Sequence, residues 1–211
     1  MHIELTEMLR CPAPHAETFL VMSTGEMLGR MVRSGILACP ACQREYPIIK
    51  GVVEFSGRGT RDGGRVEAGA TRPSSPVPPP PVDAQTLQAV LDLSGPGGYV
   101  VLLGSAVRHA TGLAALMGGI HFVGINAPPD VVELPVLSLL RCATRIPLKG
   151  AMARSVVVGA DAVVAPWMEE AQRVLLPGRR LVVESEDVAV SPPPGVTKVA
   201  VGHGMFVGER R

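Results

Sequence analysis

Four side chains near the start of the sequence have the residue types and the spacing of a metal site. Cys39 and Cys42 form a Cys-x-x-Cys pair, a tight turn that directs two thiolates at one ion. Upstream, Cys11 and His15 offer a second pair of ligands with the spacing Cys-x-x-x-His. Together these residues would make a closed Cys3His site, in which a tetrahedral zinc ion is structural rather than catalytic. A module of this size cannot fold on a hydrophobic core alone, so zinc binding would contribute directly to its folding.

Two other interpretations of the Cys-x-x-Cys pair stay open. In the first, the site no longer binds zinc, and Cys39 and Cys42 remain as small buried residues. In the second, the pair is a redox centre, but that motif belongs at a helix N-terminus after a strand, and here the strand-like run Tyr46-Pro47-Ile48 follows. The fourth cysteine, Cys142, is far away in the sequence, and we expect it to be a core residue.

The second cysteine pair and its surroundings, residues 39–53, resemble a family of small zinc ribbons, as does the run Leu9-Arg10-Cys11-Pro12. The likeness covers residues 4–55. Eukaryotic and archaeal members of that family bind and activate methyltransferases that act on tRNA, rRNA and release factors, and bacterial relatives are short stand-alone proteins. This sequence departs from the family at the first Cys-x-x-Cys. The second cysteine of that pair is missing, and the only residue able to act as a ligand in its place is His15, which lies one position further along the chain.

A second group of candidate residues lies in the middle of the chain. Gly104, Ser105 and Ala106 follow one apolar run, and Asn126 ends the next. A turn of small residues after a strand lets the backbone approach a ligand, and the N-terminus of the following helix then faces polar groups of that ligand. A nucleotide or dinucleotide enzyme is a weaker interpretation of this turn, because the sequence has no Gly-x-x-x-x-Gly-Lys-Ser/Thr run.

The elements that must position this turn are short apolar runs alternating with helical patterns. The runs are residues 99–103, 120–125, 155–158 and 180–184. They are continuous rather than alternating, which is typical of strands buried on both faces. Helices are predicted over 107–117 and 166–175, and Asp83 is the expected cap of a short helix before the first strand. Alternation of this kind predicts an α/β fold whose mostly parallel sheet is flanked by helices.

Residues 169–183, a helix followed by Pro177-Gly178 and a strand, resemble the corresponding segment of class I S-adenosylmethionine-dependent methyltransferases. The run 145–148 before the strand at 155–158 is similar to that family's Leu-Pro turn. The likeness spans residues 84–187 and implies a Rossmann-type domain. It also implies that the turn at Gly104 contacts the cofactor.

If the cofactor S-adenosylmethionine binds, the resemblance places Gly104, Ser105 and Ala106 beside its amino-acid part, Asn126 beside its ribose and residues 142–144 near its adenine. These positions depart from the family: Val107 and Arg108 are bulky where small residues are usual, and Asn126 replaces a carboxylate that accepts hydrogen bonds from the ribose. Losing such a pair of hydrogen bonds costs about 2–4 kcal/mol, or about 30- to 1000-fold in affinity. We therefore expect an eroded cofactor site.

Other polar residues of this part of the sequence give no catalytic assignment, and the catalytic residues, if any, are unknown. Asp161 follows the strand at 155–158, where many relatives place catalytic groups, but we expect a loop or helix-cap carboxylate. His109 is expected to be structural or solvated. The terminal Glu209-Arg210-Arg211 is expected to be a frayed charged tail.

Composition divides the chain into a zinc-ribbon-like domain (1–55), a Gly/Pro-rich linker (56–82) and a methyltransferase-like domain (83–211). The formal net charge of +1 gives no reason to expect RNA or a membrane surface as a partner, although RNA is not excluded. No apolar run approaches the length of a membrane span, and the start of the sequence is unlike a signal peptide, so we expect a cytoplasmic protein.

Two functional hypotheses follow. The first is a non-catalytic methyltransferase-like protein that retains the α/β fold as an interaction scaffold for a protein partner. The second is an active S-adenosylmethionine-dependent methyltransferase that carries its own zinc ribbon and acts on RNA or on a translation-related protein. Fold-level resemblance alone does not decide between them.

Overall fold

The computed structural model describes residues 1–56, 82–185 and 192–211, so the predicted linker lies almost wholly outside the described residues. The first segment contains short elements: η1 (Ile3–Met8), β1 (Val21–Thr24), β2 (Met27–Leu28), β3 (Met31–Val32), β4 (Gly35–Ala38), β5 (Glu45–Ile49) and β6 (Val52–Glu54). The remainder contains α1 (Ala84–Leu91), β7 (Tyr99–Leu103), η2 (Gly104–His109), α2 (Ala110–Leu116), β8 (His121–Ile125), β9 (Leu137–Arg141), β10 (Ala153–Val158), η3 (Ala160–Ala162), α3 (Ala165–Val174), β11 (Leu175–Glu184), β12 (Val196–Gly202) and β13 (Met205–Arg210). No helix among these is long and apolar enough to cross a membrane.

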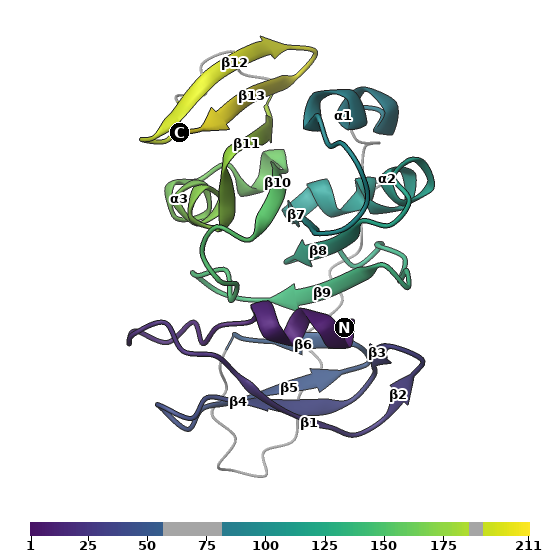
Figure 1. The fold of residues 1–211 in the computed structure, drawn as a ribbon, viewed down its shortest axis with the longest axis vertical. Coiled ribbons are helices and arrows are strands. Elements are labelled where there is room, and N and C mark those ends of the chain that lie inside the picture. The colour runs from purple at the N-terminus through teal and green to yellow at the C-terminus, as the bar shows by residue number, and fades with distance from the viewer. Residues whose placement is uncertain (57–81, 186–191) are drawn as a thin grey trace.

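Eleven of the strands form one sheet in the order β1-β4-β5-β6-β9-β8-β7-β10-β11-β13-β12, and β2 and β3 pair separately (Figure 1). Strands β9, β8, β7, β10 and β11 are parallel, and β13 and β12 follow as antiparallel neighbours. The expected α/β class, with a mostly parallel sheet flanked by helices, is confirmed. Strand order reverses at β7: β8 and β9 lie on one side of it, β10 and β11 on the other.

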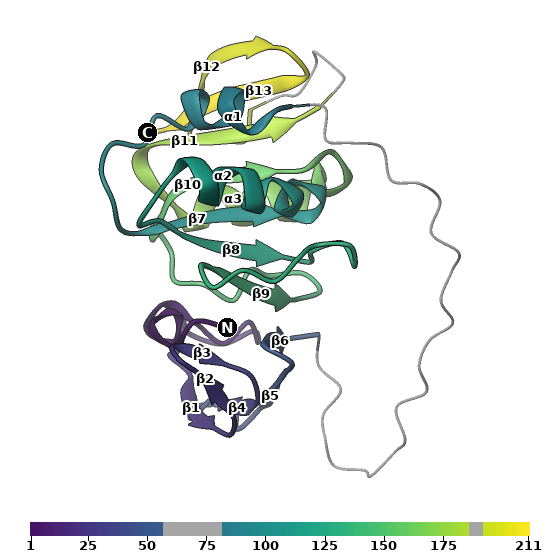
Figure 2. The ribbon, with the colours of Figure 1, turned by 90° about the vertical axis from the view of Figure 1, so that its right-hand side faces the viewer.

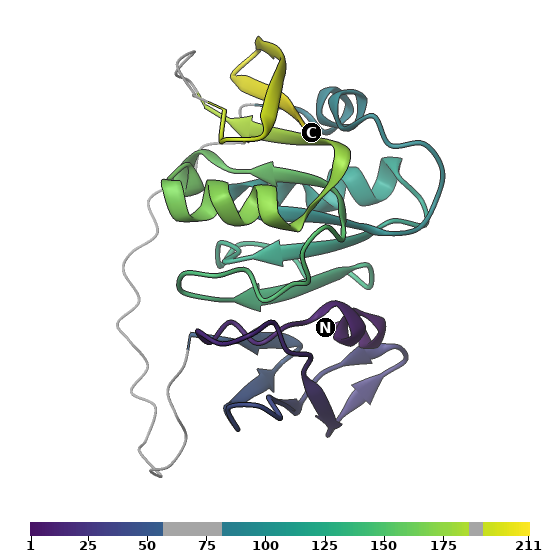
Figure 3. The ribbon, with the colours of Figure 1, turned by 60° about the vertical axis from the view of Figure 1, so that its left-hand side comes forward.

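Helices cover both faces of the parallel strands, which explains why those strands are continuously apolar. Helices α1 and α2 lie on one face and α3 on the other (Figure 3). Leu87 and Leu91 of α1 pack with Val100 on the first face, and Met168 and Val174 of α3 belong to the core on the second. The predicted cap is present, since Asp83 Oδ1 accepts a 2.9 Å hydrogen bond from the Thr86 N–H.

The N-terminal strands join the parallel sheet edge to edge. Strand β6 pairs in parallel with β9, with Val53 opposite Leu140, and the two segments lie against each other along this seam (Figure 2). The last residue of η1 and the chain just after it add backbone hydrogen bonds across the same seam, from Lys149 N to Met8 O (2.8 Å) and from Arg10 N to Pro147 O (2.9 Å). One buried cluster runs from η1 and β4 into β9 and β10. The division into domains at 55 and 83 stays a prediction, and the structure adds that both segments share a sheet and a core.

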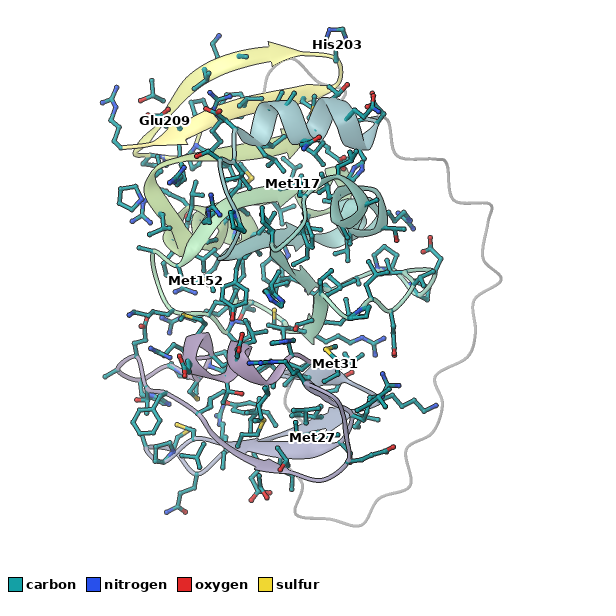
Figure 4. The ribbon with its side chains drawn as sticks, turned by 45° about the vertical axis from the view of Figure 1, so that its right-hand side comes forward. Met27, Met31, Met117, Met152, His203 and Glu209 are labelled. Atoms are coloured by element: carbon teal, nitrogen blue, oxygen red, sulfur yellow. The ribbon has the colours of Figure 1, made fainter. Side chains whose placement is uncertain are left out.

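Several elements differ from the sequence-based expectation. Helix α2 begins only at Ala110, after the 3-10 helix η2, and neither β9 nor the β12–β13 hairpin was predicted. Glu209 and Arg210 end β13 instead of forming a frayed tail, and Glu209 lies at the end of the hairpin opposite His203 (Figure 4). Glu209 is paired in register with Arg180 of β11, and the Arg210 guanidinium donates hydrogen bonds to the carbonyls of Arg173 and Leu175 at the C-terminus of α3.

Truncation of Leu140 tests the shared core. Leu140 is fully buried on β9, between β6 and β8, so Leu140→Ala removes contacts from both segments. We expect the free energy of unfolding to fall by about 2–5 kcal/mol in one cooperative transition followed by circular dichroism in urea. Val132→Ala, at an exposed position, is the control and should change it by less than about 0.5 kcal/mol. Two separate transitions, only one of them shifted, would contradict a shared core.

Candidate functional site

The four predicted metal ligands come together in the structure. Cys11 Sγ lies 3.7 Å from Cys42 Sγ, and His15 Nε2 lies 3.2 Å from Cys11 Sγ and 3.5 Å from Cys39 Sγ. All four ligand atoms lie within 4.8 Å of one another. Zinc bond lengths imply tetrahedral edges of about 3.8 Å between two sulfurs and about 3.6 Å between sulfur and nitrogen. The donor set and its spacing therefore fit a zinc ion.

Neighbouring groups orient these ligands. Cys39 and Cys42 lie in the turn between β4 and β5, closed by a 2.8 Å hydrogen bond from Gln43 N to Cys39 O. His15 Nδ1 lies 2.7 Å from the Ala16 carbonyl; donation there fixes the tautomer that leaves Nε2 free as a ligand. Tyr46 Oη lies 3.1 Å from Cys11 Sγ, a supporting contact that the sequence analysis missed.

The surroundings shift the pKa values of two of these thiols in opposite directions. Burial disfavours the Cys39 thiolate, but hydrogen bonding by the backbone amides of Cys42 and Ala41 outweighs it and lowers the pKa of Cys39 to about 7. Burial raises the pKa of Cys11, whose thiol is covered by the ribbon core. A bound cation would stabilise the thiolate form of both residues.

The Gly104 turn lies at the carboxyl end of β7, where strand order reverses and where open α/β sheets bind their ligands. Here the position is taken by a side chain of the protein itself. The Ser105 N–H donates a 2.7 Å hydrogen bond to Asp161 Oδ1, from η3 after β10. Gly104 has φ +59, and a Cβ atom on it would lie 2.5 Å from the same oxygen. The Asp161 carboxylate thus packs directly on the turn and caps it, as a loop carboxylate would.

Asn126 is also engaged within the protein. Its Nδ2 donates to the Cys142 carbonyl and its Oδ1 accepts from the Cys142 N–H, both at 2.9 Å. These two hydrogen bonds tie the end of β8 to the end of β9. Cys142 itself is buried, as expected, and burial raises the pKa of its thiol to about 12.

Two pairs of side chains complete this edge of the sheet. Arg108, bulky where a small residue was expected, binds Asp130 with both arms of its guanidinium, at 2.9 and 3.0 Å. His109 Nε2 lies 2.5 Å from Glu184 Oε1, and both side chains are almost fully buried. The structural role expected of His109 fits this pairing. The sequence analysis did not identify Glu184 as the partner of His109. The one signal in the sequence is that Glu184 is a carboxylate at the end of an apolar strand.

A pocket of about 190 Å³ lies away from this edge, at the seam between the two segments. Met31 (Figure 4) and Val52 line it from the N-terminal segment, and Leu137 and Leu139 line it from β9. It is mostly apolar apart from the Arg33–Glu133 ion pair. The predicted ligand site at Gly104 is thus distinct from this cavity.

Comparison with known proteins adds distant likenesses to solved structures. No protein-family model matches the chain, and no curated protein sequence matches it. A SAM-dependent methyltransferase from Aquifex aeolicus is similar over 61% of this chain and 88% of its own, with 17% identity and a TM-score of 0.46. The antibiotic-resistance methyltransferase Kmr is similar over 61% of this chain and 93% of its own, with 12% identity and a TM-score of 0.42.

A third structure is a complex of the Haloferax volcanii Trm112 methyltransferase activator with a methyltransferase. The matched chain has 21% identity and a TM-score of 0.38, and the similarity covers 47% of the present chain but only 50% of that one. All three TM-scores lie below 0.5, so these likenesses carry no argument about what the chain does.

Proposed function

We propose that this protein is a methyltransferase-like interaction subunit that does not catalyse methyl transfer and that carries its own zinc-ribbon module. The observation that carries the proposal is the hydrogen bond between Asp161 and the Ser105 amide. The resemblance assigns the Gly104 turn to the amino-acid part of S-adenosylmethionine, which bears a carboxylate. That carboxylate would meet another one, Asp161, already bound to the donor that it needs.

Binding of the cofactor at this turn would therefore carry two costs. The Ser105–Asp161 hydrogen bond must break, and two like charges must then lie close together unless Asp161 moves or is protonated. Asn126 adds a third cost, because its amide must leave both hydrogen bonds to Cys142 before it can bind a ribose. All three features disfavour the cofactor at the residues assigned to it.

The partner that we propose is another protein. By strand register, Val21, Ile36 and Ile49 lie on one face of the β1–β4–β5 sheet, and all three are exposed. Phe19, which precedes β1, is exposed as well. Apolar side chains gathered on one face favour a protein partner over RNA, which would require a basic surface.

Zinc, which we propose as the structural metal of the ribbon, supports the same role. The Cys-x-x-Cys turn joins β4 to β5, and β5 pairs with β6 through Ile48 and Val53. A zinc ion would hold this turn without an open coordination position, so that it would stabilise the apolar face and take no part in chemistry.

The second candidate is an active S-adenosylmethionine-dependent methyltransferase acting on RNA or on a translation-related protein. One observation favours it: Asp161 is solvent-exposed, so its carboxylate is free to rotate away from Ser105. It would then be placed to accept a hydrogen bond from the ammonium group of the cofactor's amino-acid part. The two candidates therefore predict opposite results when this carboxylate is removed.

Isothermal titration with S-adenosylmethionine distinguishes them. For the wild-type protein we expect no binding up to millimolar cofactor. Asp161→Ala frees the Ser105 amide and removes the like charge, so we expect binding at least about tenfold stronger than in the wild type. Asp161→Asn keeps the acceptor but not the charge and should lie between the two. Asp92→Asn, at the end of α1, is the control and should match the wild type.

Low-micromolar binding by the wild-type protein, lost in Asp161→Ala, would overturn the non-catalytic proposal and establish the second candidate. If neither the wild-type protein nor Asp161→Ala binds S-adenosylmethionine, the Asp161 carboxylate is not the group that prevents the cofactor from binding at the Gly104 turn.

Metal analysis tests the ribbon site. We expect a tightly held zinc ion, and a cobalt-substituted protein should show thiolate-to-cobalt charge-transfer absorption. Cys42→Ser should weaken metal binding at this site at least about tenfold, because one of four ligands is lost. Cys142→Ala, which removes the cysteine outside the cluster, should leave the charge-transfer bands unchanged. Acidification should release the metal as Cys and His ligands become protonated. Bands that survive in Cys42→Ser but vanish in Cys142→Ala would refute the assignment.

A further inference from the structure

Two histidines meet at the seam between the N-terminal segment and the α/β sheet. His2 precedes η1 and His121 begins β8; their ring centroids lie 4.5 Å apart with the rings tilted by 52°. Glu4 Oε2 lies 3.9 Å from His2 Nδ1. One ligand atom from each of the three residues lies within 4.8 Å of the other two.

The two imidazoles hold an unusual pair of nitrogen atoms. His2 Nδ1 and His121 Nδ1 are both buried, and neither has a hydrogen-bond partner among the residues that the structure describes. His2 is only 6% exposed, so water does not easily replace a protein partner. Buried polar atoms are almost always paired in folded proteins, and a bound cation is one partner that these ring nitrogens could take.

The backbone fixes this arrangement. The His2 N–H donates a 2.9 Å hydrogen bond to Ser138 Oγ on β9, which holds His2 against the sheet. His121 is held from the other side by the register of β8 with β7, where it lies opposite Tyr99. The two oxygens of the Glu4 carboxylate have different neighbours: Oε1 pairs with Arg30, and Oε2 faces His2. The ligand atoms thus converge from elements that the fold already anchors.

The geometry points to a second metal site: we propose that His2, Glu4 and His121 bind a divalent transition metal of the zinc class that joins the N-terminal segment to the sheet. Tetrahedral zinc requires nitrogen and oxygen ligand atoms about 3.3–3.4 Å apart. The His2–Glu4 distance exceeds this by about half an ångström, and Glu4, half-exposed, is free to close that gap.

Two nitrogens and one carboxylate select zinc, cobalt, nickel or copper over magnesium and calcium, which prefer oxygen ligands. The site lies at the amino ends of β7 and β8, at the opposite edge of the sheet from the Gly104 turn. A metal bound there would therefore link the N-terminal segment, through His2 and Glu4, to β8 of the sheet, through His121. None of the residues of the Gly104 turn takes part, so this second site does not depend on whether that turn binds a cofactor.

Titration of zinc into the full-length protein, already loaded with zinc at its cysteine site, tests the proposal. We expect a second equivalent to bind the wild-type protein. His121→Phe keeps a ring beside His2 and Tyr99 but removes the ligand, so we expect binding of this equivalent to weaken at least about 30-fold. His203→Asn, at the exposed tip of the β12–β13 hairpin (Figure 4), removes a histidine elsewhere and should leave it unchanged.

Cobalt added as the second metal identifies the ligands. At this site it should give weak d–d absorption without thiolate charge transfer, in contrast to the cysteine site. The second equivalent should also raise the unfolding temperature of the wild-type protein, and not that of His121→Phe. Should His121→Phe fail to fold, Glu4→Gln changes a half-exposed side chain and is expected to weaken binding at least about tenfold. Absence of a second equivalent, or its persistence in both variants, would overturn the proposal.

Discussion

The parallel pairing of β6 with β9 is the constraint on which the rest of this structure depends. Without β6, strand β9 would be the edge of the parallel sheet and would leave a row of unpaired backbone groups. Pairing in the observed register sets Val53 against Leu140 and continues the buried layer from one segment into the other. It also brings η1 to the seam, where the Arg10 N–H donates to the Pro147 carbonyl and the Lys149 N–H donates to the Met8 carbonyl.

The polar groups of the cysteine cluster and those at the carboxyl edge of the sheet differ in whether they are already paired within the protein. In the ribbon, Cys39, Cys42 and His15 bring ligand atoms within 4.8 Å of one another, a spacing that a metal ion could bridge. At the carboxyl edge of the sheet, Ser105 and Asp161 satisfy each other, and so do Asn126 and the backbone of Cys142. A site whose donors and acceptors are already paired offers little net free energy to a ligand, because each new hydrogen bond replaces an existing one.

Sequence reasoning succeeded where local chemistry restricts the choice of residues. The strand 99–103 was predicted with the bounds of β7, because only a strand buried on both faces tolerates so continuous an apolar run. The clustering of Cys11, His15, Cys39 and Cys42 was anticipated because thiols and an imidazole at such short spacings are typical of metal sites, and their binding of a metal stays a prediction. Strand β9 was missed because Pro135 interrupts the apolar pattern just before it, and Pro weakens any strand assignment.

Contacts between distant positions were beyond the reach of one sequence. Nothing local to Ser105 indicates that Asp161 will bind its amide, and nothing local to His109 indicates Glu184. Both pairs exist because β7, β10 and β11 end at the same edge, a consequence of the parallel topology that the sequence did predict. Topology thus limits which residues can meet, and side-chain packing decides which of them do. The seam follows the same logic: where β6 lies beside β9, His2, just before η1, meets His121 at the amino end of β8.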